Sequence, residues 1–264
     1  MRPAPVFPLK DNIPTDRTAF VTIAFIAINV IVYFVLQTKG GIFSGPSDTG
    51  VVDYGAIPYE VTNPGKDCYD AGGESLACEG KAGVKDTADP QPSAYVTAFT
   101  AMFMHGGLLH LGGNMLFLWI FGNNVEDSMG RVKFLAFYLL GGIAALGAQI
   151  AIDPSSTVPT IGASGAVAGV LGGYLLLFPR ARVVTVIFII FFFTILELPA
   201  ILILGFWFLQ QVLFGYFDLA GPTDGGGGVA YFAHIGGFVF GLLAIKLFAT
   251  RRRDRQRGGE PAAG

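Results

Sequence analysis

The residues that could do chemistry are a serine, two histidines and an asparagine within long apolar stretches. Ser164 begins "SGAVAGVLGGYLLLF", and His234 lies in "AHIGGFVFG". A serine hydroxyl becomes a nucleophile when a histidine within hydrogen-bond reach accepts its proton and later passes it to the leaving amine. The amide of Asn114 and the ring of His110, four residues apart in "HLGGN", are candidate donors to the oxyanion of a tetrahedral intermediate. These residue types predict acyl transfer by an activated serine.

The sequence predicts a Ser164–His234 dyad, because no acidic residue is placed to orient the histidine as a third member. Gln210 and Gln211 are expected to bridge helices or to face water at the end of their segment. The backbone N–H of Ser164 has no intrahelical partner if a helix begins there, so it is a further candidate oxyanion donor.

The composition places these residues in a membrane. Of the 264 residues, 52% are hydrophobic and only 14% are charged, whereas a soluble domain carries about 25% charged residues. A membrane-spanning helix needs about 20 apolar residues. We therefore predict an all-α membrane protein, a bundle of six transmembrane helices. The predicted spans are 18–37, 107–124, 132–152, 164–178, 199–217 and 229–249.

Pro199 divides the longest apolar region, because proline interrupts a helix. The part after it is predicted to be the fifth span. Residues 183–198, before it, are expected to form a membrane-surface or re-entrant connection.

The distribution of basic residues orients this bundle. Lysine and arginine gather on the cytoplasmic side of membrane proteins, and six spans place both termini on one side. We predict a cytoplasmic N-terminal segment (1–17), a six-span domain (18–249) with a long outer loop (38–100), and a basic, disordered C-terminal tail (250–264). Of the 17 basic residues, 13 then lie on the inner side: Arg2, Lys10, Arg17, Arg131, Lys133, Arg180, Arg182, Lys246, Arg251, Arg252, Arg253, Arg255 and Arg257.

The predicted spans bring four polar side chains to one depth. The span 164–178 covers about 22 Å as a helix, which is less than the hydrocarbon core of about 30 Å. Basic residues anchor its far end at the inner surface, so Ser164 should lie roughly 8 Å below the outer surface. His234 lies five residues into its span, at a similar depth, and His110 and Asn114 share one face of the second span. Polar residues inside spans are usually functional, so we expect an active site open to the outer side.

Glycines are spaced to let two of these helices pack closely. Gly165 begins a stripe at four-residue spacing after Ser164, and Gly237 and Gly241 form another after His234. Small residues at this spacing let helix backbones approach one another in lipid. If the two stripes meet, the serine and the histidine come within hydrogen-bond distance.

The outer loop 38–100 is acidic and rich in glycine and proline, so it is expected to be mostly irregular. Cys68 and Cys78 both lie in it, on the oxidising side, and their spacing is compatible with a disulfide and with two free thiols. The segment 218–228 contains four consecutive glycines from Gly225, which makes it a candidate mobile cap over the site.

Three motifs taken together resemble the rhomboid intramembrane serine proteases, over about residues 95–249. They are "GASG" with Gly162 and Ser164, "HGGLLHLGGN" with His105, His110 and Asn114, and "AHIGGFVFG" with His234, Gly237 and Gly241.

The resemblance implies a role for each of these residues. Ser164 would be the nucleophile, His234 the general base, and His110 and Asn114 the oxyanion hole. His105 would support the site near a water-accessible cavity. The family cleaves membrane-anchored substrates in or near their transmembrane helices without metal or cofactor, so the resemblance implies transmembrane substrates and a place in a bacterial cell membrane.

One departure concerns the first loop. Many relatives carry a Trp-Arg pair ahead of the second span, whereas "SAYVTAFTAMFMHGG" contains neither residue. The absence bears on how this loop is anchored in the membrane and not on the chemistry.

Other interpretations explain single residues but not the set. A lone serine in a span is usually a packing residue. The hydrolase signature G-x-S-x-G fails at Ala166, and His105 and His110 lack the spacing and the glutamate of a zinc protease. Two other functions are a catalytically inactive rhomboid-like protein that binds membrane clients, and a transporter, which would need charges at mid-membrane. Nucleic-acid binding is not expected, and the sequence does not determine the oligomeric state.

Overall fold

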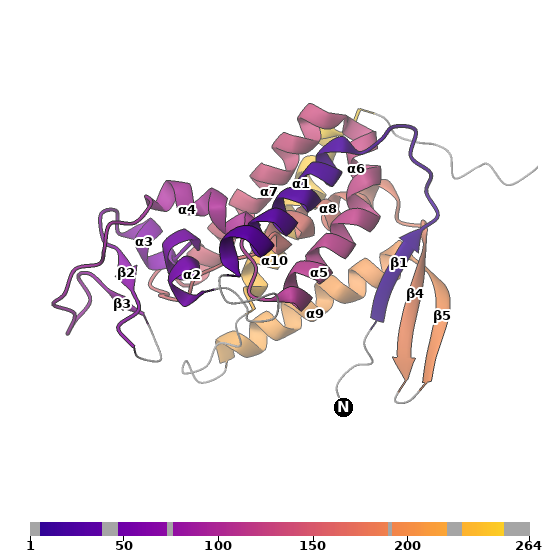
Figure 1. Cartoon of the computed structure of the whole chain (residues 1–264). Coiled ribbons are helices and arrows are strands. Elements are labelled where there is room, and N and C mark those ends of the chain that lie inside the picture. Colours follow the sequence, from indigo (N-terminus) through magenta and orange to yellow (C-terminus); the bar gives the residue numbers. More distant parts are fainter. Residues whose placement is uncertain (1–5, 39–46, 73–75, 190–191, 221–228, 251–264) are drawn as a thin grey trace, which may run out of the picture.

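The protein is mostly helical in a computed structural model, which describes residues 6–38, 47–72, 76–189, 192–220 and 229–250. The glycine run of the predicted cap, from Gly225, and residues 251–264 of the predicted tail lie outside the described residues. Figure 1 labels the helices and strands. In chain order they are β1 Val6–Asp11, α1 Phe20–Ile31, η1 Val32–Gln37, α2 Asp48–Tyr54, α3 Pro58–Thr62, β2 Cys68–Tyr69, β3 Ala77–Cys78, α4 Ala94–Thr100, η2 Ala101–Phe103, α5 Leu108–Phe117, η3 Leu118–Gly122, α6 Asn123–Met129, α7 Arg131–Ile152, α8 Ser164–Leu177, β4 Arg182–Ile189, β5 Phe192–Pro199, α9 Ala200–Ala220 and α10 Tyr231–Phe248.

Four helices in the described part of the chain are long and apolar enough to cross a membrane: the continuous helix Phe20–Gln37, α7, α9 and α10. The chain is therefore an integral membrane protein that crosses more than once. Two further predicted spans also correspond to helices. The run α5–η3–α6 is interrupted by polar residues, and α8 has only 14 residues.

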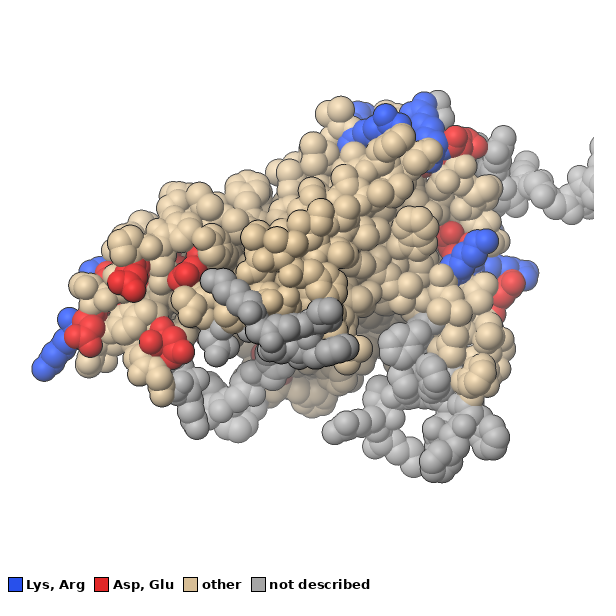
Figure 2. Space-filling view, in the orientation of Figure 1, with Lys and Arg blue, Asp and Glu red and all other residues tan. Residues whose placement is uncertain are grey.

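Charge is separated along the molecule. In Figure 2 acidic side chains gather over the segment of α2, α3 and the small β2–β3 hairpin, basic side chains gather where α1 begins, and uncharged surface lies between. Large apolar side chains of the helices are exposed, among them Ile31, Leu213 and Leu243. Exposed apolar surface between two charged ends is typical of a lipid-facing belt.

Helix α8 lies at the centre of the bundle. Every residue from Gly165 to Tyr174 is buried, and α7 and α10 pack along it (Figure 1). At its far end Tyr174 packs against Phe121, with 4.8 Å between ring centroids. A helix that is apolar on all sides needs neighbours all round. The element that begins with Ser164 is therefore firmly held.

A three-stranded antiparallel sheet contradicts the prediction of an all-α protein. Strands β4 and β5 form a hairpin where a membrane-surface or re-entrant connection is predicted for 183–198, and β1 pairs with β4. This run is rich in valine, isoleucine, phenylalanine and threonine, which favour strands. Periodicity does not separate a short buried strand from a buried helix, and the partner strand β1 lies far away in the sequence.

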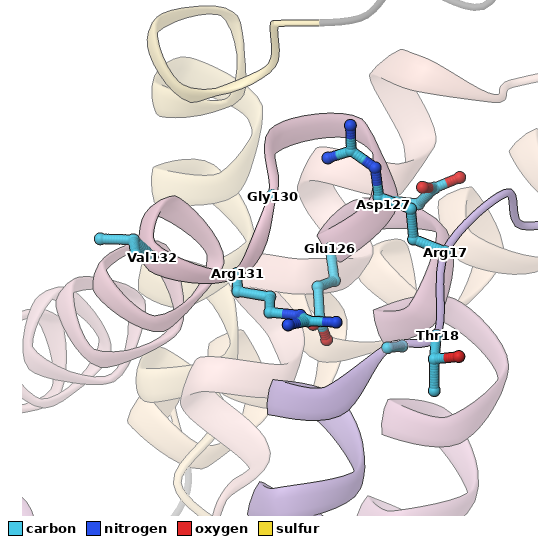
Figure 3. Close-up of a pocket in the computed structure, with 8 residues that line it drawn as sticks. Arg17, Thr18, Glu126, Asp127, Gly130, Arg131 and Val132 are labelled. Carbon is cyan, nitrogen blue, oxygen red and sulfur yellow. The ribbon is translucent and has the colours of Figure 1, made fainter.

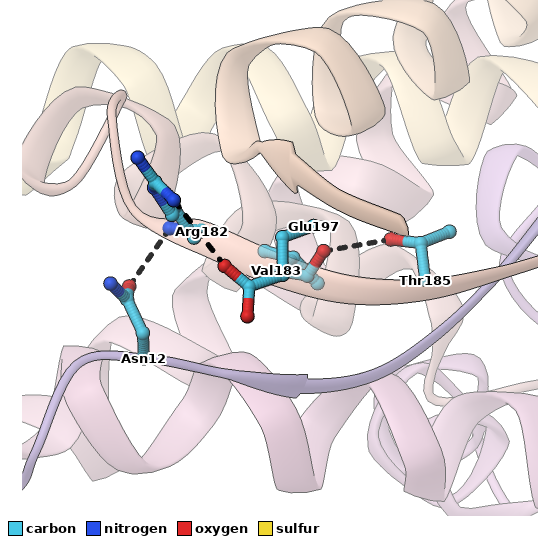
Figure 4. A network of polar contacts seen from close by, with 5 residues as sticks. All are labelled: Asn12, Arg182, Val183, Thr185 and Glu197. Carbon is cyan, nitrogen blue, oxygen red and sulfur yellow. Dashed lines mark hydrogen bonds and ion pairs between the residues drawn. The ribbon is translucent and has the colours of Figure 1, made fainter. Parts of the chain in front are cut away.

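Polar contacts connect the chain at the end of the sheet where β4 begins and β5 ends (Figure 4). The backbone N–H of Arg182 donates to the side-chain oxygen of Asn12 at 2.8 Å, and its guanidinium lies 3.5 Å from the carboxylate of Glu197. The Thr185 hydroxyl donates to the carbonyl of Val183. Pro199 ends β5 and α9 begins at the next residue, so the proline divides the apolar region as predicted.

The N-terminal strand is tied to the bundle through Asp11, which is buried. Its carboxylate accepts hydrogen bonds from Asn124 Nδ2 and from the Tyr174 hydroxyl, both at 2.6 Å. A buried carboxylate is costly unless such donors satisfy it. These bonds join β1 to α6 and to the end of α8 opposite Ser164.

A pocket lies where α1 begins, against the turn between α6 and α7 (Figure 3). Within it the Glu126 carboxylate accepts hydrogen bonds from the backbone N–H groups of Val21 and Thr22, at 3.0 and 2.8 Å. An acidic group at a helix N-terminus satisfies its unpaired N–H groups. The contacts in this pocket therefore stabilise the packing of α1 against α6. Its lining residues are Arg17, Thr18, Ala19, Glu126, Asp127, Gly130, Arg131 and Val132.

Residues 47–72 and 76–100, termed the outer segment after the outer loop 38–100 that the sequence predicts, are more ordered than the expected irregular loop. Cys68 and Cys78 form a disulfide between β2 and β3, which decides between the two alternatives left open by their spacing. Val52, Ile57 and Tyr59 pack against the disulfide in a small core separate from that of the bundle. The crosslink allows so small a core to persist.

Candidate active site

Ser164 and His234 are hydrogen-bonded, although 70 residues separate them in the chain. The serine Oγ lies 2.8 Å from His234 Nε2. Ser164 is the first residue of α8, and His234 lies in the first turn of α10, so the contact joins the starts of two helices. Both side chains are half-buried.

Backbone contact between α8 and α10 determines how close these helices lie. A Cβ at Gly237 would overlap the carbonyl oxygen of Gly165, and one at Gly241 would overlap that of Gly169. Only residues without a side chain permit such an approach. A larger residue at either position must move α10 away from α8, and His234 with it.

Gln211 of α9 occupies the other side of the histidine. Its Oε1 lies 2.8 Å from His234 Nδ1, and the side chain is only 7% exposed. The sequence predicts a dyad with no third group beside His234. Gln211 is therefore a residue of the site that the sequence did not predict. The available signal was a strongly polar residue within an apolar span, and helix bridging explained it equally well.

The ring of His110 lies against the backbone just before the serine. Its Nδ1 accepts a hydrogen bond from the backbone N–H of Gly106 at 3.3 Å, so the neutral ring carries its proton on Nε2. Gly162 has a φ of 124°, a conformation that L-residues rarely adopt. A Cβ there would lie 2.8 Å from His110 Nε2 and 3.5 Å from Ser164 Oγ. Gly162 therefore keeps the space beside the serine open to the His110 N–H.

Asn114 lies one helical turn beyond His110 on α5 and is buried. Its side-chain Nδ2 has no hydrogen-bond partner among the described residues. An unsatisfied buried N–H costs about 1–3 kcal/mol. Such a group has a physical explanation where a reacting oxygen takes the hydrogen bond.

His105 is fully buried and supports the ring of His110. Their ring centroids lie 5.1 Å apart in an edge-to-face arrangement. The His105 backbone N–H donates to Gln37 Oε1 at 3.0 Å, and its carbonyl accepts from Gln37 Nε2 at 3.2 Å. The end of the first helix therefore fixes the loop that leads into α5.

The loop 153–163, which leads into Ser164, is hydrogen-bonded to the outer segment. Thr160 and Ala56 exchange two backbone hydrogen bonds, at 2.8 and 3.1 Å. The Tyr59 N–H donates to the carbonyl of Ser156, and the Gly162 N–H donates to that of Ala101. The outer segment and the active-site loop therefore form one connected structure.

The groups gathered at the site are a hydroxyl, imidazoles and amides, which serve proton transfer and hydrogen bonding. His110 is exposed at the surface of the protein. Within the described part of the chain, no three His, Cys, Asp or Glu residues form a group that could hold a metal ion.

Several known proteins are similar to this chain. A family model described as the Rhomboid domain matches residues 92–251. Rhomboid protein 1, mitochondrial, of Saccharomyces cerevisiae is 31% identical over 168 residues, which are 61% of this chain and 44% of that protein. Rhomboid protease GluP of Bacillus subtilis is 30% identical over 154 residues, 58% and 24% of the two chains. The human Presenilin-associated rhomboid-like protein, mitochondrial, is 29% identical over 146 residues, 54% and 35% of the two chains.

The matched region spans less than half the length of each of these relatives. One of them is bacterial and the other two are named as mitochondrial. Together they support an integral membrane protein, and they do not single out the bacterial cell membrane that the sequence analysis predicts.

Proposed function

The chain belongs to the rhomboid family, whose model matches more than half of it, and we propose that it is an intramembrane serine endopeptidase. It hydrolyses peptide bonds in or near the transmembrane segments of membrane-anchored substrates. One observation carries the proposal: Ser164 Oγ lies 2.8 Å from His234 Nε2. At this distance a histidine can take the proton of an attacking hydroxyl. The relative GluP, which is named a protease, adds support.

The proposed reaction proceeds through an acyl-enzyme. Ser164 Oγ attacks the scissile carbonyl carbon while its proton passes to His234 Nε2. The tetrahedral intermediate collapses, the C–N bond breaks, and His234 gives the proton to the departing amine. Water then attacks the ester carbonyl and gives a proton to His234. The ester bond breaks, the new carboxyl product leaves, and Ser164 recovers its proton.

Three donors are proposed to stabilise the oxyanion. The His110 Nε2–H lies beside the serine, the Asn114 amide has an unsatisfied buried N–H, and the Ser164 backbone N–H begins a helix. Donors aimed at developing negative charge lower the barrier most when they need no reorganisation. His110 and Asn114 lie in the first two turns of α5, and Ser164 is the first residue of α8.

The proposed topology has six spans with both termini on the cytoplasmic side. The α5–η3–α6 run and the short α8 complete the set with the four longer helices. The basic side chains where α1 begins and the acidic outer segment at the other end agree with that orientation (Figure 2). In this topology the active site opens to the outer side of the membrane.

Substrates are proposed to be transmembrane helices with small or helix-breaking residues, because only an unwound strand exposes its carbonyl to attack. Access beside α9 follows from the family resemblance. The lipid bilayer is the second partner, and no metal or cofactor takes part.

The test is cleavage of a tagged single-span substrate in proteoliposomes by wild type, Ser164→Ala and His234→Ala. We expect wild type to cleave and both variants to leave the substrate intact. A fluorophosphonate should label wild type and not Ser164→Ala. Folded wild type that neither cleaves nor reacts with the probe would contradict the proposal and favour a rhomboid-like protein that binds membrane clients without cleaving them.

A further inference from the structure

The bond between Gln211 and His234 determines which nitrogen of the histidine carries the proton. The Gln211 atom at 2.8 Å from Nδ1 is the amide oxygen, which can only accept a hydrogen bond. With the amide in this orientation, the contact is a hydrogen bond only when Nδ1 carries the proton, and in the neutral ring Nε2 then keeps its lone pair. That lone pair faces Ser164 Oγ at 2.8 Å, as the acceptor of the serine proton requires.

Without Gln211, the neutral ring could carry its proton on Nε2 instead. It would then donate to the serine oxygen and could not accept the serine proton. In serine–histidine–aspartate sites the third residue prevents this by holding the tautomer and the orientation of the ring. An amide oxygen can do the same. It contributes less to an imidazolium than a carboxylate, because it carries no full charge.

Aromatic side chains before and after Gln211 in the sequence pack α9 against α10. Trp207, one turn before it, lies 5.8 Å from the His234 ring. Phe214, almost one turn after it, lies 5.9 Å from the ring of Tyr231. Phe208 stacks on Phe238 with centroids 4.5 Å apart. The face of α9 toward α10 is therefore aromatic, and the glutamine amide lies within it.

Close approach of the two helices adds to this restraint. A Cβ at Gly215 would lie 3.3 Å from Tyr231 Cβ, so α9 and α10 are in contact just beyond Gln211. The opposite side of α9 is exposed, with Leu209, Val212 and Leu213 on it. The third group at the histidine thus comes from a helix that packs mainly through one side (Figure 1).

We propose that Gln211 is a positioning residue that makes a Ser164–His234–Gln211 triad, and that His234 is competent as a base only while α9 lies against α10. The inference rests on the proposed function and deepens it. It differs from a helix-bridging glutamine, which would hold α9 in place but leave the tautomer of His234 and the reactivity of Ser164 unchanged.

The experiment uses the full chain in liposomes with three variants. Gln211→Met keeps the length of the side chain and removes the acceptor, Gln211→Glu keeps an acceptor, and Gln210→Met is the matched control at the neighbouring, half-buried glutamine. Ring ¹⁵N spectra report the tautomer directly, because the chain has only 3 histidines. The rate of fluorophosphonate labelling reports serine reactivity without substrate access, and cleavage of a single-span substrate separates kcat from KM.

We expect Gln211→Met to lower both the labelling rate and kcat roughly 10- to 100-fold, less than loss of the base itself, with KM unchanged. The His234 ring should then lose its uniform Nδ1–H signal. Gln211→Glu should keep that signal and recover most of the rate, and Gln210→Met should match wild type.

Folded Gln211→Met with wild-type labelling rate and unchanged ring spectrum would overturn the proposal. So would a loss of stability with normal reactivity per folded molecule, which is the result for a bridging glutamine alone. Failure of the proposed function looks different, because wild type itself would neither label nor cleave. The ring spectra would still test the Gln211–His234 bond in that case.

Discussion

At the scale of single residues, the space around the serine depends on an absent side chain. Gly162 combines a φ of 124° with a position where a Cβ would meet the His110 ring. Any other residue would meet both backbone strain and a steric clash. Asn114 keeps an unsatisfied buried donor in the described part of the chain, and in the proposed reaction this donor would bind the oxyanion.

Replacing Asn114 tests this division of roles. Asn114→Ala should keep the fold and slow cleavage by about 10²–10³-fold, the usual cost of one oxyanion donor. Thermal unfolding should show no loss of stability, because the removed N–H has no partner in the described part of the chain. Turnover equal to that of wild type in proteoliposomes would remove Asn114 from the oxyanion hole.

A second residue-scale prediction concerns Glu60 in the outer segment. Burial raises the pKa of Glu60 to about 7 from an ordinary value of 4.5, although its carboxylate accepts a hydrogen bond from the Cys68 N–H. The folded state therefore binds a proton more tightly than the unfolded state. The stability of this segment should be greatest below about pH 4.5 and should fall as the pH rises to about 7, by roughly 3 kcal/mol at most.

Glu60→Gln should remove this pH dependence, since an amide does not ionise and can still accept from Cys68. Hydrogen exchange of the Cys68 amide at pH 5 and pH 8 measures it. Glu79→Gln, the same change in the same segment, is the control and should leave the dependence in place. An equal slope in wild type and Glu60→Gln would show that another group is responsible.

At the scale of helices, the site exists because two backbones touch. Ser164 and His234 begin neighbouring helices whose glycines face each other's carbonyl groups. In lipid there is no hydrophobic force between helices, so contact area and close approach provide the attraction. The same contact that holds α8 against α10 therefore also sets the distance between Ser164 and His234.

Gly237→Ala should separate the two helices. Its Cβ would overlap the Gly165 carbonyl, so we expect a loss of about 1–3 kcal/mol in unfolding free energy and a larger loss of labelling by a fluorophosphonate. Gly147→Ala on α7 is the control, because a Cβ there meets nothing within 4 Å. If Gly237→Ala matched Gly147→Ala in both measurements, the close approach would not be what positions the base.

At the scale of the whole molecule, the outer segment, which contains the disulfide, contacts the helical bundle at the loop 153–163 that leads into Ser164. The outer segment binds that loop through the pair Ala56–Thr160 and through Tyr59 and Ser156. Lys81 Nζ also donates to the carbonyl of Ser155 at 2.8 Å. The long outer segment thus supports the backbone of the loop that leads into Ser164.

Removing the disulfide should loosen this support. A variant with Cys68→Ser and Cys78→Ser should destabilise the outer segment by about 2–4 kcal/mol, a typical value for a native disulfide. Hydrogen exchange should rise in residues 56–62 and 154–162, and cleavage should slow while the bundle stays folded. Faster exchange confined to the outer segment, with unchanged cleavage, would show that the loop does not depend on it.

The fold was partly accessible from the sequence. Six predicted segments coincide with helices because apolar length is a local property, and the expected family agrees with the matched model. The hairpin β4–β5 was missed because its residues suit either a strand or a buried helix. The partner that decides the matter, β1, lies at the other end of the chain.

By itself, the sequence determined a membrane protein of the rhomboid family and the residues with which it could do chemistry, because composition, span length and motif spacing are properties of the chain alone. Only the tertiary structure decided which atoms meet. In the structure Gln211 Oε1 lies at hydrogen-bond distance from His234 Nδ1, and Cys68 and Cys78 form a disulfide. The outer segment is hydrogen-bonded to the loop 153–163. A hydrogen bond forms only when donor and acceptor are placed to within a few tenths of an ångström of their preferred separation. Helical periodicity does not specify that placement for elements far apart in the chain.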